Sequence, residues 1–313
     1  MLNADNCNCS TRSNQLNIYR RNLDVIKMQK LLNFCLEMEF YLKIALSCTI
    51  AQQLFFWLLN KLKLNFIIQV LLYWLVGTIS FYAIGIFIEK LIKSDDSLTK
   101  KLTVRVKKVK KQSFPNFTLK GIITGEIKAL ITALIIIYLA PEVHRGNGLI
   151  LNMGWFFMRI VAADFCFYVA HRLFHTKPFL KIHLKHHEFQ DTSSFVAGHK
   201  SLIEYIIVTM TDVLPIFIFG YDITQLCAWT LIGNIYNLEG HSSLSIFFIP
   251  SNFHDLHHTS FHGNYGIHSF WDRVFKTLNP INKKTGIMFP VNSIESKLNS
   301  ISSELNIIKS VNK

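Results

Sequence analysis

The chain has 313 residues, of which 50% are hydrophobic and 17% charged, with a mean hydropathy of +0.28 and a formal net charge of +13. A soluble chain of this kind normally carries about 25% charged residues. The composition therefore excludes an ordinary soluble domain and predicts an integral membrane protein.

The N-terminal segment is polar. Residues 1–30 contain no apolar stretch of the kind found in a signal peptide. The first part, rich in Asn, Ser and Cys, is expected to be a disordered tail, and residues 16–38 are expected to form a short amphipathic helix.

Membrane-spanning helices are expected where about 20 consecutive residues are predominantly apolar. Residues 66–88 fit this requirement best because they carry no charge. The expected spans are residues 41–59, 66–88, 122–140 and 149–170, and the weaker segments 202–219 and 223–238 either span or re-enter the membrane.

Positive charge is concentrated in one run. Residues 100–111 contain seven Lys or Arg and no acidic residue. Such a run can bind nucleic acid, but between two apolar spans it is typical of a cytosolic loop. If residues 122–170 and 202–238 each cross the membrane and return, the segments that follow them emerge on the cytosolic side as well.

Three histidine clusters follow these spans, within residues 171–175, 183–187 and 254–258. Histidines at positions i, i+3 and i+4 lie on one side of a helix, and imidazole nitrogens bind metal ions at about 2.0–2.1 Å. Three such clusters predict a polyhistidine metal centre. The candidate ligands are His171, His175, His183, His186, His187, His254, His257 and His258.

Other roles fit these histidines less well. A structural zinc site needs four ligands and usually includes thiolates, whereas a haem protein needs one or two axial histidines. A metal transporter would carry its ligands inside the spans. A two-metal centre remains, but imidazole binds iron, copper and zinc alike, so the spacing does not identify the metal.

The three clusters lie in motifs that resemble those of the fatty acid hydroxylase/sterol desaturase superfamily. The similar segments are Asp164–His175 (DFCFYVAHRLFH), His183–His187 (HLKHH), His254–His258 (HDLHH), Gly263–Gly266 (GNYG) and Trp271–Thr277 (WDRVFKT). The resemblance covers roughly residues 150–280.

This resemblance implies a membrane oxygenase of the endoplasmic reticulum with two iron ions and a lipid substrate taken from the bilayer. Oxidation of an unactivated C–H bond also requires a redox-active metal, which zinc is not. Hydroxylation of a sterol or another lipid is the first expectation. Desaturation, C-4 methyl oxidation and a catalytically silent metal- or lipid-binding relative remain alternatives. The sequence shows neither a haem motif nor a nucleotide-binding glycine fingerprint, so a separate haem protein or reductase is expected to supply electrons.

The resemblance also extends the list of candidate ligands to His241 and His199. Asp164 lies two helical turns before His171, so we expect it to hydrogen-bond a ligand. His262 is expected near the site or at the surface, and His144 and His268 are not expected to bind metal.

The expected fold is all-α, a multi-span integral membrane helical bundle with a cytosolic histidine-rich metal-binding cap. Four regions are expected: a polar tail and amphipathic segment (1–38), a membrane hairpin with the basic loop (39–120), the catalytic domain (121–285) and a C-terminal tail (286–313).

Overall fold

The computed structural model describes residues 8–93, 119–144, 146–189, 192–242, 246–248 and 253–279. These residues form helices joined by turns, and the β-type pairing found among them is an isolated bridge between Glu142 and Tyr221. In chain order the helices are α1 (Asn8–Leu59), α2 (Phe66–Lys93), α4 (Leu119–Leu139), α5 (Leu149–Phe174), α6 (Leu180–His183), α7 (Leu202–Phe219), α8 (Ile223–Gly240), α9 (Phe253–Ser260) and α10 (Ser269–Val274), with 3₁₀ turns η1 (His186–Glu188) and η2 (Ser194–Gly198). The prediction of an all-α fold is confirmed.

Contacts divide the chain into two units, residues 1–39 and residues 40–313. Helix α1 begins at Asn8 and continues into the second unit, so it starts inside the segment for which the sequence predicts a disordered tail. The reason is that its sequence contains neither proline nor glycine, the residues that interrupt helices most strongly. The basic run at residues 100–111 lies outside the described residues.

Four helical segments are long and apolar enough to cross a bilayer. They are Glu37–Leu59, Phe66–Leu91, Gly121–Leu139 and Leu149–Phe174. They coincide with the four stronger spans that the sequence predicts. On α4, Ile123, Ile127 and Ile131 recur every fourth residue and are about half exposed, which identifies a face of this helix directed at lipid.

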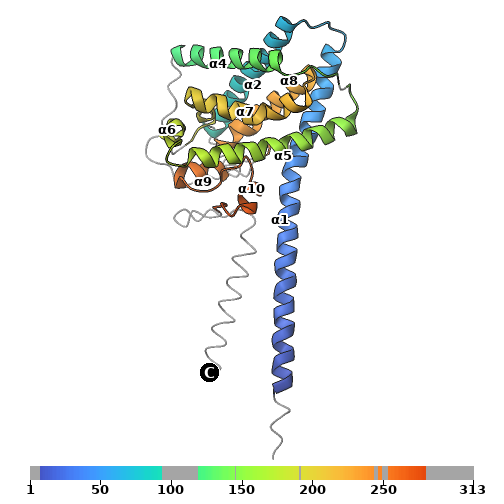
Figure 1. Ribbon diagram of the computed structural model, residues 1–313, viewed down its shortest axis with the longest axis vertical. Coiled ribbons are helices and arrows are strands. Elements are labelled where there is room, and N and C mark those ends of the chain that lie inside the picture. The colour runs from blue at the N-terminus through green and yellow to red at the C-terminus, as the bar shows by residue number, and fades with distance from the viewer. Residues whose placement is uncertain are drawn as a thin grey trace, which may run out of the picture. The chain divides into compact units, whose positions relative to one another are not determined.

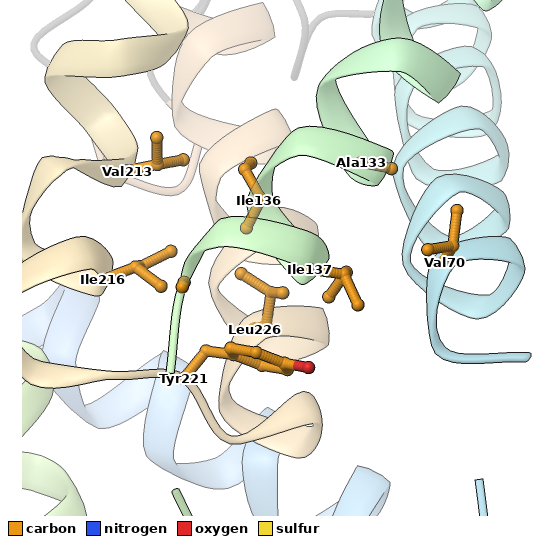
Figure 2. Close-up of a cluster of buried hydrophobic side chains, with 9 residues drawn as sticks. Val70, Ala133, Ile136, Ile137, Val213, Ile216, Tyr221 and Leu226 are labelled. Atoms are coloured by element: carbon orange, nitrogen blue, oxygen red, sulfur yellow. The ribbon is translucent and has the colours of Figure 1, made fainter. Parts of the chain in front are cut away.

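The long helices of the second unit pack in two main groups. Helix α2 lies against α4 and α8, and α5 lies against α7 (Figure 1). Helix α4 links the groups through contacts with α7. Figure 2 shows the buried side chains at this junction: Ala133, Ile136 and Ile137 of α4, Val70 of α2, Val213 and Ile216 of α7, Leu226 of α8, and Tyr221. Because lipid is as apolar as these side chains, close packing rather than exclusion of water holds the helices together here.

The turn between α4 and α5 is bound to the turn between α7 and α8. Tyr221 donates its backbone N–H to Pro141 O at 2.8 Å, and Val143 donates to Tyr221 O at 2.7 Å. Gly220 has a φ of +81°, and a Cβ there would lie 2.4 Å from Val143 Cγ2, so only glycine fits. Both hairpins therefore turn at the same end of the bundle. The C-terminal ends of α5 and α8 and the N-terminal end of α7 all lie at the opposite end.

Buried amides connect α1, α5 and α8 near these turns. Asn152 donates to Gln52 Oε1 at 3.1 Å and accepts from Gln225 Nε2 at 2.6 Å. Gln52 also donates to Thr224 Oγ1 at 3.2 Å. All four side chains are buried. Each amide forms a hydrogen bond with another side chain of the network, which would otherwise lack a partner in the membrane.

We expect Asn152→Leu to lower the free energy of unfolding by about 1–2 kcal/mol, because it leaves Gln52 and Gln225 short of partners. Denaturant unfolding of the detergent-solubilised protein measures this loss. Asn147→Leu is the matched control, because the Asn147 side chain is exposed; its effect should stay below about 0.5 kcal/mol. Equal losses in the two variants would contradict a stabilising role for the buried network.

Candidate metal centre

Nine histidines converge at the end of the bundle opposite the bound turns. They come from the last turn of α5 and the residue that follows it, from α6 and η1, from the end of α8, and from α9. Figure 1 shows α6 and α9 close to the C-terminal end of α5. The i, i+4 spacing of His171 and His175 directs both toward α9, because residues four apart share a helix face.

The nine histidines form two groups, and within each group the potential ligand nitrogens lie within 4.8 Å of one another. The first group, called the five-histidine group below, is His171, His175, His183, His187 and His257. The second, the four-histidine group, is His186, His241, His254 and His258.

In the five-histidine group the Nε2 atoms form a chain of short separations. His171 and His175 lie 3.1 Å from His183 and His257, respectively. His187 lies 3.0 Å from both His183 and His257. Two nitrogens bound to one ion at about 2.0–2.1 Å and at right angles to each other are about 3 Å apart, so these separations fit shared coordination.

The hydrogen bonds of these rings also fit a bound cation. The Nδ1 atoms of His171 and His257 lie 2.8 Å from the backbone oxygens of Tyr265 and Gly263. A carbonyl oxygen only accepts hydrogen bonds, so each Nδ1 carries the proton and each Nε2 presents a lone pair. Nδ1 of His183 likewise faces Glu204 Oε1 at 2.8 Å. Lone pairs that converge at these distances repel one another unless a positive ion lies between them.

The four-histidine group has the same organisation. Nδ1 of His241, His258 and His186 faces the backbone oxygens of Asn237, Phe189 and His199 at 2.8, 3.2 and 3.3 Å. Nε2 of His254 and Nε2 of His258 are buried without a hydrogen-bond partner. Buried polar atoms are normally paired, so these two nitrogens fit a site built to hold an ion.

The loop after α9 positions two of the ligands. The Asp272 carboxylate accepts hydrogen bonds from the backbone N–H groups of Tyr265 at 3.0 Å and Gly266 at 2.8 Å, which fixes the carbonyls that face His171 and His257. Gly263 has a φ of +71°, and a Cβ there would lie 2.3 Å from Thr277 O. The motifs Gly263–Gly266 and Trp271–Thr277 thus form one clamp that orients ligand imidazoles.

Glu204 is a site residue that the sequence reasoning did not assign. Besides accepting from His183 Nδ1, it is fully buried at the start of α7, where the Ser201 side chain caps the helix by accepting from Glu204 N. An acidic residue in the first turn after a capping serine marks the start of a helix in the sequence. The pairing of Glu204 with His183 is not marked in this way, because the two residues lie in different segments.

Other predicted residues lie apart from the two groups. His199 Nε2 is 2.8 Å from Glu188 Oε2, and His199 belongs to neither group. Asp164 accepts from the Tyr41 hydroxyl at 2.5 Å and from Ile267 N at 2.7 Å, so it fixes the segment next to the Gly263–Gly266 loop. His268 stacks on Phe40 with ring centroids 4.3 Å apart. His144 and His262 are exposed.

Two cavities adjoin the histidines. The larger, of about 430 Å³, runs between α2, α4, α7 and α8 and reaches His241 and His254, and its size lies within the range of small-molecule sites. The smaller, of about 30 Å³, has His171 and His183 of one group and His186 of the other in its wall. This volume suits one molecule the size of water or O2.

Burial keeps the histidines neutral. Burial and, to a smaller extent, neighbouring histidines together lower the pKa of His183 and of His187 to about 2 and that of His175 to about 4. Neutral imidazole is the form that binds metal.

We expect metal-free protein to lose stability as the pH falls. Above about pH 6.5 these histidines are neutral in both states; below it, the unfolded chain takes up protons that the folded site excludes, which costs up to about 1.4 kcal/mol per pH unit for each histidine. The midpoint of thermal unfolding in excess chelator should therefore drop between about pH 7.5 and about pH 5. A midpoint independent of pH over this range would contradict burial of neutral histidines.

The fold and the site together define an integral membrane protein whose clustered histidines could hold metal. Residues 156–277 match the family model described as fatty acid hydroxylase. This match supports the resemblance to the fatty acid hydroxylase/sterol desaturase superfamily that the motifs of this segment predict.

Curated relatives support the same resemblance. The chain is 32% identical over 128 residues to methylsterol monooxygenase 1 of Gallus gallus, covering 37% of this chain and 43% of the relative. It is 31% identical over 128 residues to a putative methylsterol monooxygenase of Dictyostelium discoideum, covering 37% and 48%. It is 29% identical over 131 residues to fatty acid hydroxylase domain-containing protein 2 of Homo sapiens, covering 39% of each chain. The match thus spans less than half of each relative. No solved structure matches the chain.

Proposed function

We propose that the protein is a membrane-bound lipid oxygenase that uses O2 and holds two iron ions, one in each histidine group. The observation that carries this proposal is the pair of histidine groups beside a lipid-sized cavity between membrane helices. The family match and the names of the relatives support oxidation of a lipid.

The ligands fit iron chemically. His171, His175, His183, His187 and His257 would hold one ion, and His186, His241, His254 and His258 the other. Imidazole suits iron as well as zinc and copper, and bound iron would supply the redox chemistry that O2-dependent C–H oxidation requires. Glu204, Asp272 and the carbonyls of Tyr265 and Gly263 keep the rings oriented and deprotonated at Nε2.

A sterol is the first candidate substrate, because two relatives are named methylsterol monooxygenases. In hydroxylation, one oxygen atom of O2 enters a C–H bond and the other leaves as water, with two electrons and two protons taken from outside the substrate. A separate haem protein or reductase would deliver these electrons at the cytosolic side of the endoplasmic reticulum membrane, which the histidine end of the bundle would face. Desaturation of the same lipid needs the same metal and donor.

Expression of the chain in a sterol-producing host, followed by mass spectrometry of its lipids, tests the proposal. We expect a new lipid that is heavier by one oxygen atom, or lighter by two hydrogens if the outcome is desaturation. Purified active protein should contain about two iron ions per chain. Iron-loaded protein that changes no lipid in the presence of a reductase system would instead identify a silent metal-binding relative.

A further inference from the structure

Two carboxylates line the large cavity, Glu126 from the candidate membrane span Gly121–Leu139 and Asp212 from α7. Glu126 of α4 accepts hydrogen bonds from the Thr78 hydroxyl at 2.5 Å and from Trp74 Nε1 at 3.0 Å. Asp212 of α7 accepts from Trp229 Nε1 at 3.0 Å and from the Tyr236 hydroxyl at 3.4 Å. Both acidic residues line the cavity. Ionisable residues inside a membrane are costly and are kept for a function more often than for stability.

Both carboxylates lie away from the histidines. The cavity follows α8 from His241 back to Thr230, a rise of about 16 Å at about 1.5 Å per residue. Asp212 is bonded to Trp229, next to Thr230. Glu126 is bonded to Thr78, next to Gly77, where a Cβ would lie 3.5 Å from the Thr230 side chain. The cavity therefore has histidines at one end and carboxylates at the other.

The carboxylate end can accept further hydrogen bonds. A carboxylate offers about four acceptor positions. This number exceeds the hydrogen bonds that Glu126 and Asp212 each accept from the side chains named above. The Arg159 guanidinium lies 4.1 Å from the centre of the Trp229 ring, so a positive charge close to Asp212 offsets part of its negative charge. A neutral hydroxyl can donate to these oxygens, whereas the carboxylate of a fatty acid would be repelled by them.

We propose that the large cavity binds a lipid alcohol with its hydroxyl hydrogen-bonded to Asp212 and Glu126 and its apolar body extending toward His241 and His254. This assignment rests on the proposed function and deepens it by naming the substrate class and the orientation of the substrate. The carbon that reaches the histidines is then up to about 16 Å from the hydroxyl, the rise of the eleven residues from Thr230 to His241. In a sterol, the end opposite the hydroxyl-bearing ring would face the histidines, and a methyl group beside the hydroxyl would not.

Photolabelling of the full chain in phosphatidylcholine nanodiscs tests the orientation. Two analogues of hexadecanol are used, one with a diazirine beside the hydroxyl and one with a diazirine near the methyl end. We expect the first to label residues around Asp212 and Thr230 and the second to label residues around His241 and Ile267. The reverse pattern, or labelling outside the cavity, would overturn the proposal.

Competition tests the chemistry of the head group. Hexadecanol should displace the label at least about tenfold better than hexadecanoic acid, equivalent to about 1.4 kcal/mol. The double variant Glu126→Gln, Asp212→Asn should reduce this preference about tenfold, and its unchanged helical circular dichroism would show that it folds. Glu142→Gln, a matched change outside the cavity, should keep the preference.

Equal affinity for the alcohol and the acid in the unaltered protein, or an unchanged preference in the double variant, would overturn the proposal. These measurements need no turnover. A protein that binds the alcohol as described but oxidises no lipid would therefore refute the proposed function while leaving the binding assignment intact.

Discussion

Replacing His257 or His241 with alanine is expected to remove one of two iron ions and to abolish turnover. Each side chain belongs to a different histidine group, so each variant should retain the ion of the other group. Changes to residues that merely orient ligands typically cost 10–100-fold in metal affinity or activity, and loss of a ligand should cost more than about a hundredfold.

Elemental analysis of the purified variants, together with lipid product formation, measures both effects. His144→Ala is the control, because His144 is exposed and belongs to neither group; it should retain both ions and normal turnover. Retention of two ions by both ligand variants would falsify the division into two sites.

Asp272→Ala should have the second largest effect, although Asp272 belongs to neither histidine group. Its carboxylate holds the backbone of Tyr265 and Gly266, and also accepts from the Thr277 hydroxyl at 2.6 Å. Without it, the loop carbonyls no longer fix the rings of His171 and His257. We expect the affinity of the five-histidine group for iron to fall about 10–100-fold.

Competition with a chelator of known affinity measures this loss. Glu188→Ala provides the control, because Glu188 is exposed and its described partner, His199, belongs to neither group. Iron affinity that is equal in the Asp272→Ala variant and the unaltered protein would show that the loop does not position the ligands. A loss in the Glu188→Ala variant would instead point to a role for His199.

The membrane helices and the histidine clusters could be predicted from the sequence because both are local patterns. Apolar length alone located the four spans. The division of ligands between two groups was not predictable. Pairs four residues apart, such as His183 and His187, share a group, whereas His186 joins the other. In a regular helix, residues three apart and residues four apart both lie on one side, so spacing alone does not separate His186 from His187. Residues 180–188 instead form a short helix followed by a 3₁₀ turn.

The partners of the ligands were hidden for a different reason. Five of the acceptors for ligand imidazoles are backbone oxygens, of Tyr265, Gly263, Asn237, Phe189 and His199. Every residue carries such an oxygen, so no residue type marks it. The pairing of His183 with Glu204 depends on the packing of α7 against α6. This tertiary contact cannot be read from the local sequence around either residue.

The hydrogen bonds between the two hairpin turns restrict how the bundle can open. At that end, Tyr221 is bound to Pro141 and Val143, and Gly220 leaves no room for a side chain. These hydrogen bonds hold the α4–α5 hairpin and the α7–α8 hairpin together at that end of the bundle. A side chain at position 220 would meet Val143 and the Pro141 carbonyl, so it would separate the two turns and displace the helices of both hairpins at once.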